Sequence, residues 1–373
     1  MRKHVSFRFR VLALLLLFFA GSFALSASRS GNTSLWLLTA AVPGVILFLL
    51  LLPSGLFPLD RPSLAAGLTL CGLSILAPVS FGPEEALSQA LRCAAALFFL
   101  FAGAVLLRIY RPSLPGSVLL SALSLGLLSL PLWLPGVPLS PGDGASVILL
   151  LGVVSFLSLR LRLPALLCAL CGLFLFLLRS DPVSGGIWTL AFILLFWASS
   201  GSSLWTGISL CSAGGLFIFW ILLTPLPDSA GASVFSRLSA MSVVLPESVP
   251  ESILPEDSLF LLLGEQYGLL FLLSAVLLAV LLLIRGASLA LQSRKQFHAS
   301  AALGVLLLLG IRALAFLLNL ADLLPLPAGS FPFLSLSPET LCTDMFFLGI
   351  LSGISARNEA DLSEDVRLSM LAR

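Results

Sequence analysis

Long apolar runs separated by short polar connections extend over most of the chain. A helix needs about 20 mostly apolar residues to cross about 30 Å of hydrocarbon, because it rises about 1.5 Å per residue. Twelve segments fit this description approximately: 11–27, 34–52, 63–80, 86–107, 115–134, 144–159, 163–178, 187–200, 204–223, 258–284, 300–321 and 340–356. The pattern predicts an all-α, polytopic membrane protein with about 12 transmembrane helices.

Basic residues are distributed unevenly between the two sides of this topology. Fifteen of the 20 Lys and Arg residues fall at the chain ends or in alternate connections on one side. Arg29, Arg92, Arg179 and Arg237 fall on the other side, and Arg312 lies inside a predicted span. Cytoplasmic connections carry an excess of Lys and Arg. We therefore expect a multi-pass protein of the cytoplasmic (inner) membrane with both termini cytoplasmic.

The first apolar segment has a second interpretation. Basic residues within 1–10 precede an apolar stretch and the small residues around Ala27, which is also the pattern of a secretory signal peptide. A retained span is the favoured interpretation, because another apolar segment follows at once.

Composition narrows the range of functions. The chain is 58% hydrophobic and 10% charged, against about 25% charged residues in an ordinary soluble domain. A net charge of +2 argues against nucleic acid as a partner. Two His and two Lys residues leave little for histidine chemistry or a histidine metal site. No cofactor or metal is predicted, although acidic residues in the longest loop could attract a divalent cation.

That longest loop covers residues 224–257, on the predicted outer face. It is rich in Pro and acidic residues and has one basic residue, Arg237. Long structured loops often carry function, although a solvated, Pro-stiffened acidic loop is the plainer interpretation.

Three ionisable residues lie in the last three predicted spans. Glu265 is eight positions after Asp257, or about 12 Å along a helix, and Arg312 and Asp344 lie in the two spans that follow. A charge inside a membrane costs a few kcal/mol unless it is paired or faces water, so each is a candidate functional residue. We expect one polar cavity in which Arg312 pairs with one or both acids. An ion pair that only locks the helices together explains the pattern equally well.

The motifs around these residues resemble the SEDS family (shape, elongation, division and sporulation), which includes FtsW, RodA and SpoVE. The matching motifs are Leu254-Pro-Glu256 followed by Asp257, Gly264-Glu-Gln-Tyr-Gly268, Gly310-Ile-Arg312, Leu323-Leu-Pro325 and Pro332-Phe-Leu-Ser335. On this register Arg312 stands where the family has Gln, and Asp344 where it has Asn. The resemblance implies a ten-helix SEDS-like core over 63–356 containing the outer loop, an N-terminal two-helix addition over 1–62, and a cytoplasmic tail over 357–373.

The resemblance also implies an activity. SEDS proteins are peptidoglycan glycosyltransferases that join lipid-linked disaccharide (lipid II) outside the membrane, in cell division or cell-shape maintenance. Asp257 is in register with the family's catalytic aspartate, which takes a proton from the acceptor sugar. Arg312, Glu265, Ser335, Arg237 and Asp344 are the candidate substrate-binding residues, and an undecaprenyl-diphosphate-linked sugar is the expected substrate. A class B penicillin-binding protein and other divisome or elongasome components are the implied partners.

Some family motifs are replaced. Leu336-Ser-Pro-Glu-Thr340 stands where the family has Tyr-Gly-Gly-Ser-Ser, and the His-Thr before the catalytic Asp is missing. Two other functions therefore stay open. One is a non-catalytic scaffold for a penicillin-binding protein, and the other is a flippase or transporter of a lipid precursor.

Overall fold

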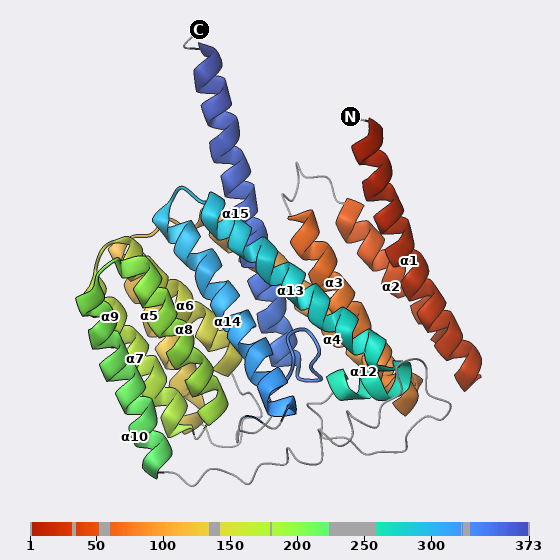
Figure 1. Cartoon of the computed structure of the whole chain (residues 1–373), viewed down its shortest axis with the longest axis horizontal. Helices are drawn as coiled ribbons and strands as arrows, with labels where there is room; N and C mark the ends of the chain where they lie inside the picture. Colours follow the sequence, from red (N-terminus) through yellow and green to blue (C-terminus); the bar gives the residue numbers. More distant parts are fainter. Residues whose placement is uncertain are drawn as a thin grey trace.

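The computed structural model describes residues 2–31, 35–51, 60–133, 142–179, 181–223, 259–321, 323 and 329–371. Within these ranges the chain is helical apart from turns, caps and an isolated bridge between Phe331 and Leu334. The helices form a bundle with both chain termini at one end, which we call the terminal end (Figure 1). The opposite end, where α10 stops and α12 lies, is called the loop end.

The helices follow the predicted spans closely. In chain order they are α1 (Arg2–Ser30), α2 (Leu35–Leu51), α3 (Arg61–Leu76), η1 (Ala77–Phe81), α4 (Pro83–Ile109), α5 (Leu114–Trp133), α6 (Gly142–Ser158), α7 (Arg162–Leu178), α8 (Pro182–Ser200), α9 (Ser203–Ser209), η2 (Leu210–Gly214), α10 (Gly215–Leu223), α12 (Leu259–Tyr267), α13 (Leu269–Gln292), α14 (Gln296–Leu320) and α15 (Pro338–Leu371).

Six of the described helices are long and apolar enough to cross a membrane, and five shorter apolar helices accompany them. Each predicted span coincides with helical structure. The all-α, multi-pass class is therefore confirmed, whereas the number of helices that cross the membrane stays a prediction.

The expected unbroken span over 258–284 is wrong at Gly268. This residue has a φ of +88°, and α12 ends just before it while α13 begins just after it. Glycine adopts such a φ without the steric cost that a Cβ imposes. The chain turns at this point, so Glu265 lies on a separate short helix at the loop end (Figure 1) and not part-way along a continuous transmembrane helix.

The contact between α4 and α15 is the most extensive in the bundle. A Cβ built on Gly103 of α4 would lie 2.6 Å from the carbonyl oxygen of Phe346, and one on Gly349 of α15 would overlap the backbone of Leu100. Small residues allow helices in a membrane to approach this closely. These glycines therefore set the distance between the two helices.

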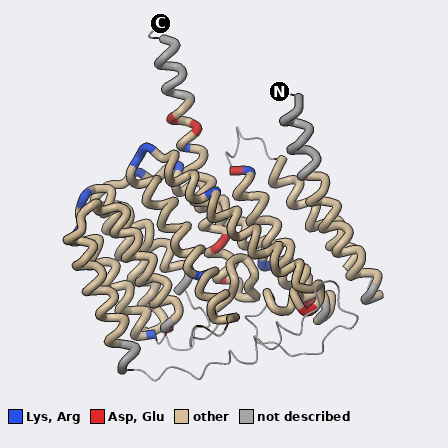
Figure 2. The backbone as a smooth tube through the Cα atoms, in the orientation of Figure 1, with Lys and Arg blue, Asp and Glu red and all other residues tan. Residues whose placement is uncertain are grey.

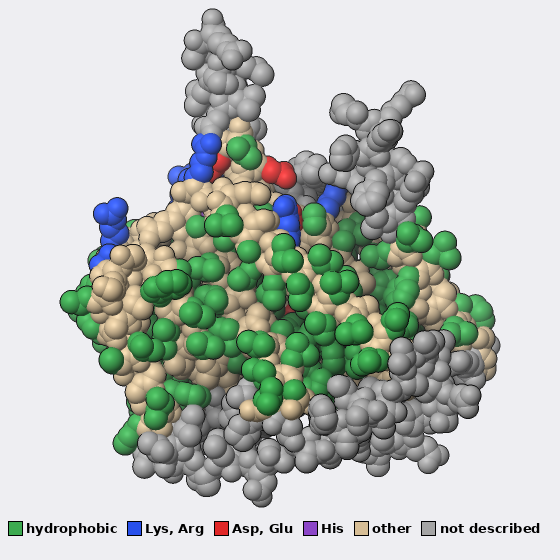
Figure 3. Space-filling view, viewed as in Figure 1, with side chains coloured by type: hydrophobic (Ala, Val, Ile, Leu, Met, Phe, Trp, Pro, Cys, Tyr) green, Lys and Arg blue, Asp and Glu red, His purple; other side chains and the backbone are tan. Residues whose placement is uncertain are grey.

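The surface agrees with a membrane environment. Hydrophobic side chains cover much of the face seen in Figure 3. Lys and Arg residues gather mainly towards the terminal end of the bundle (Figure 2). An apolar band with basic residues at one edge is the arrangement that a bilayer selects.

Candidate functional site: an ion pair and a buried turn near the loop end

Arg312 and Asp344 form an ion pair inside the bundle. Nη2 of Arg312 donates a hydrogen bond to Oδ1 of Asp344, joining α14 to α15. The Asp344 side chain is 0% exposed and that of Arg312 is 14% exposed. Both lie roughly 9–12 Å from the loop-end termini of their helices, counting residues along each helix. The expected pairing of Arg312 with an acid is confirmed.

Asp344 also holds a turn of backbone within the apolar interior. Phe331, Phe333, Leu334 and Ser335 are all 0% exposed. Buried backbone groups must find partners, because water cannot supply them there. The Phe333 N–H donates to Oδ2 of Asp344 at 2.7 Å, and the Leu334 N–H donates to the Phe331 carbonyl at 3.0 Å. Phe333 has a φ of +64°, so this contact holds a non-glycine residue in the left-handed region.

Helix α4 holds the end of the same turn. Nε2 of the fully buried Gln89 donates to the Ser335 carbonyl at 2.9 Å and to Oγ of Ser74 at 2.7 Å. Nη1 of Arg92 donates to the Leu336 carbonyl at 3.0 Å. Neither role was predicted from the sequence. A polar side chain within the apolar run of 86–107 was the only available signal for Gln89.

These contacts restrict what the residues can do chemically. Both carboxylate oxygens of Asp344 accept hydrogen bonds, and its charge offsets that of Arg312. Oγ of the buried Ser335 accepts from the Ser337 N–H at 3.1 Å. In this arrangement Ser335 and Asp344 support the turn and are shielded from ligands. The buried Nε of Arg312 lacks a hydrogen-bond partner in the described part of the chain.

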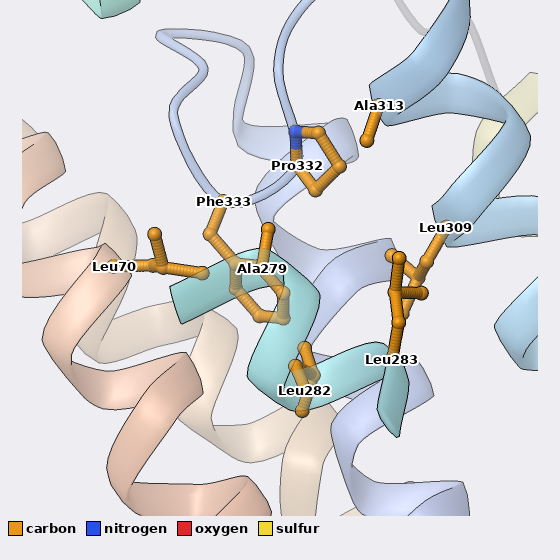
Figure 4. A pocket seen from close by; sticks show the side chains of 8 residues that line it. All are labelled: Leu70, Ala279, Leu282, Leu283, Leu309, Ala313, Pro332 and Phe333. Carbon is orange, nitrogen blue, oxygen red and sulfur yellow. The ribbon is translucent and has the colours of Figure 1, made fainter. Parts of the chain in front are cut away.

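A small apolar crevice lies beside the turn (Figure 4). Its lining comes from α3, α13, α14 and the turn: Leu70, Ala279, Leu282, Leu283, Leu309, Ala313, Pro332 and Phe333. Its volume of about 10 Å³ is enough for about one water molecule. Pockets for organic ligands measure about 300–1,000 Å³. This crevice is therefore not a cleft for a lipid-linked sugar.

Two of the predicted site residues, Asp257 and Arg237, lie outside the described residues. Glu265 lies on α12 and is half-buried. At the start of α12, the ring of Phe260 lies 4.9 Å from that of Phe331 and 5.3 Å from that of Phe316. The short helix that follows the long loop therefore packs directly against the buried turn.

A second ion pair, near the terminal end, was not predicted. Asp60 is 5% exposed, and Arg285 contacts it through Nη2–Oδ1 at 2.6 Å and Nε–Oδ2 at 3.1 Å. Ser63 and Ser355 also donate to this carboxylate, so it joins α3, α13 and α15. Burial raises the pKa of Asp60, but the hydrogen bonds from Arg285 and Ser63 outweigh it, so the pKa lies below its usual value. No cluster of three or more His, Cys, Asp or Glu residues that could hold a metal occurs in the described ranges.

Comparison with known proteins gives both sequence and fold relatives. No family model matches the chain. A segment of 107 residues is 32% identical to the probable peptidoglycan glycosyltransferase FtsW of Geobacter metallireducens and covers 28% of each chain. The FtsW protein of Geobacter sulfurreducens matches at the same identity, with 28% of this chain and 29% of the relative covered. The match thus spans little more than a quarter of these relatives.

Solved structures extend the similarity to most of the fold. A chain from a peptidoglycan synthase complex that coordinates polymerization and crosslinking superposes with a TM-score of 0.63 at 18% identity. It covers 80% of this chain and 98% of its own. The rod-shape-determining protein RodA of Thermus thermophilus gives a TM-score of 0.59 at 19% identity, covering 80% of this chain and 96% of its own.

Together the helices, the buried turn and these comparisons define a polytopic, all-helical membrane protein with the fold of the synthase chain and of RodA. Within that class, one segment of the chain is also similar in sequence to FtsW, a protein of the SEDS family. The resemblance found in its motifs is thereby confirmed.

Proposed function

We propose that this protein is a peptidoglycan glycosyltransferase that polymerises lipid II on the outer face of the cytoplasmic membrane, in cell division or cell-shape maintenance. The segment shared with FtsW is the observation that carries the proposal, because those relatives are probable peptidoglycan glycosyltransferases. The motif that places Asp257 in register with the family's catalytic aspartate gives additional support.

The proposed reaction joins two lipid-linked saccharides. A hydroxyl oxygen of the acceptor sugar attacks the anomeric carbon of the donor, a new glycosidic C–O bond forms, and the bond from that carbon to the diphosphate oxygen breaks. Undecaprenyl diphosphate leaves with the bonding electrons. Asp257 takes the acceptor proton as the general base.

The departing diphosphate needs cations or hydrogen-bond donors. Arg237 is the better candidate, because it is the only basic residue in the sequence of the loop 224–257. Arg312 already pairs with Asp344, so its charge is largely offset. Its contribution to diphosphate binding comes from the shape of its side chain and from the N–H donors that are not bonded to Asp344. Glu265 is a candidate for contact with the sugar, since it lies on the helix that follows Asp257.

The domain division and orientation are part of the same proposal. The solved structures cover 80% of the chain, and the proposed core over 63–356 is a similar share of it. Residues 1–62 would then be the N-terminal addition and 357–373 the tail. Both termini lie at the end towards which basic residues gather, which supports cytoplasmic termini in the inner membrane (Figures 1 and 2).

The test is polymerisation of labelled lipid II by the purified full-length protein, with glycan strands separated on a gel. Asp257→Ala should lower the rate by a factor of about 100 or more, as expected for loss of a general base. Asp228→Ala is the matched control, because it makes the same change in the same loop and should leave the rate unchanged. Equal rates for Asp257→Ala and wild type would refute the assignment of Asp257.

A non-catalytic scaffold is the second candidate. It is favoured by residues 336–340, which stand where the family has a different motif. The backbone at the start of this segment is hydrogen-bonded to the side chains of Arg92 and Ser335. The synthase complex among the structural neighbours makes a class B penicillin-binding protein the natural partner to test. Co-purification with such a partner, without polymerisation by the wild-type pair, would favour the scaffold. Movement of labelled lipid II across vesicle membranes would instead favour a flippase.

A further inference from the structure

Helix α1, which belongs to the proposed N-terminal addition, contacts α12 through a buried hydrogen bond. Oγ of Ser26 lies 2.9 Å from the hydroxyl oxygen of Tyr267, and the two residues are 9% and 8% exposed. Ser26 also donates to the carbonyl of Ser22 at 2.9 Å. A serine hydroxyl has one proton, so it can donate only one of these hydrogen bonds. When Ser26 donates to the Ser22 carbonyl, Tyr267 is the donor in the Ser26–Tyr267 bond.

Aromatic rings extend this contact. The Tyr267 ring stacks on Phe271 of α13 with centroids 5.0 Å apart, and Phe18 of α1 lies 5.6 Å from Phe271. The fully buried Phe19 ring fits against Gly72 of α3, where a Cβ would overlap it. Helix α1 is thus held by α3 and α13 while its Ser26 contacts the last residue of α12.

The two ends of α12 are fixed in different ways. Its start packs on the buried turn through Phe260 and Phe331, and its end is set by the Ser26–Tyr267 hydrogen bond next to the turn at Gly268. Asp257 is two residues before the first residue of α12. Helix α12 is therefore the described element nearest to Asp257 in the sequence.

We infer that the N-terminal addition is a positioning element for the active site, and that Tyr267 is the positioning residue through which it acts on α12. Loss of the Tyr267 hydroxyl would let the end of α12 move and would place Asp257 less accurately against the acceptor sugar. This inference rests on the proposed glycosyltransferase function for its effect on activity, but not for its effect on α12.

The chain supplies a matched control. Its only other tyrosine, Tyr110, also makes a hydrogen bond, to Oγ of Ser155 at 2.9 Å, but this bond joins the C-cap of α4 to α6. Tyr267→Phe and Tyr110→Phe each remove one hydroxyl from a helix contact. The two variants should lower the thermal unfolding temperature of the full-length protein by similar amounts. A difference between them in exchange or in polymerisation therefore reflects where the hydroxyl was lost and not a general loss of stability.

The experiment measures hydrogen–deuterium exchange in nanodiscs together with lipid II polymerisation. Tyr267→Phe should speed exchange in 259–267 by about three- to tenfold, the factor expected for one hydrogen bond, whereas Tyr110→Phe should leave those amides unchanged. Ser26→Ala and the double variant should give the same increase as Tyr267→Phe. Polymerisation by Tyr267→Phe should fall in kcat at nearly unchanged KM.

Unchanged exchange in 259–267 for Tyr267→Phe would overturn the positioning role. Faster exchange with an unchanged kcat would overturn its link to Asp257. If the wild type does not polymerise lipid II at all, the proposed function fails, and the exchange measurement alone still decides whether the N-terminal addition holds α12.

Discussion

Neutralising both members of the Arg312–Asp344 pair should be tolerated far better than neutralising one. Arg312→Gln leaves a carboxylate in a site that is 0% exposed, with the Phe333 N–H as a remaining donor. Asp344→Asn leaves a guanidinium that is 14% exposed, and one amide oxygen must then serve two donors. Removing one partner of a buried pair costs about 3–5 kcal/mol, and Arg312→Gln should be the worse change because its stranded charge is the more deeply buried.

In the double variant the two introduced amides can satisfy each other. The amide oxygen at position 344 would accept from the Phe333 N–H, while the amide NH₂ at the same position donates to the amide oxygen at position 312. No charge is then left without a partner. We expect this variant to lie within about 1.5 kcal/mol of wild type, since replacing a whole buried ion pair is often nearly neutral.

The free energy of unfolding can be followed in mixed micelles with a thiol-reactive dye. With the more accessible Cys171, Cys211 and Cys342 replaced by Ser in all variants, the remaining free thiols of Cys71, Cys93 and Cys168 are buried, so the dye reports loss of packing in the bundle. A double variant whose destabilisation equals the sum of the two single variants would refute the argument, because the residues would then act independently.

Other predictions concern close packing, the turn and pH. Gly349→Ala should destabilise the protein by about 1–3 kcal/mol in the same micelle assay, because its Cβ overlaps α4, while the helical Gly126→Ala, with open space around it, should be neutral or slightly stabilising. Gln89→Leu should cost about 1–3 kcal/mol by stranding the Ser335 carbonyl, and full stability of this variant would contradict the assigned contact. The lowered pKa of Asp60 means that its contribution to stability is complete above pH of about 4 and is lost as pH falls through the folded-state pKa. The difference in unfolding temperature between wild type and Asp60→Asn should therefore be constant at about pH 5–7 and shrink below about pH 4.

The helical spans were predictable because a run of apolar residues long enough to cross a membrane is a strong local signal. The Arg312–Asp344 pair was predictable for a related reason, since a charge in an apolar span needs a partner and few candidates exist. These features depend on residues whose chemical type stands out from their surroundings. They required no knowledge of how distant segments pack.

The break at Gly268 and the buried turn could not be predicted in the same way. A single glycine within an apolar run is compatible with a continuous helix, so its positive φ becomes visible only in the structure. The turn depends on Gln89, which is 246 positions away from Ser335. The Asp60–Arg285 pair likewise joins residues 225 positions apart, and each looked like an ordinary charge beside a span.

The glycine contact between α4 and α15 has a consequence for biosynthesis. Helix α4 ends at Ile109 and α15 begins at Pro338, so the ribosome must translate everything between them before the two can meet. At about 5–20 residues per second this takes on the order of 10–45 s, during which the face of α4 around Gly103 has only lipid or provisional neighbours. A nascent chain stalled before Pro338 lacks the helix that completes the bundle and is exposed to membrane quality-control proteases.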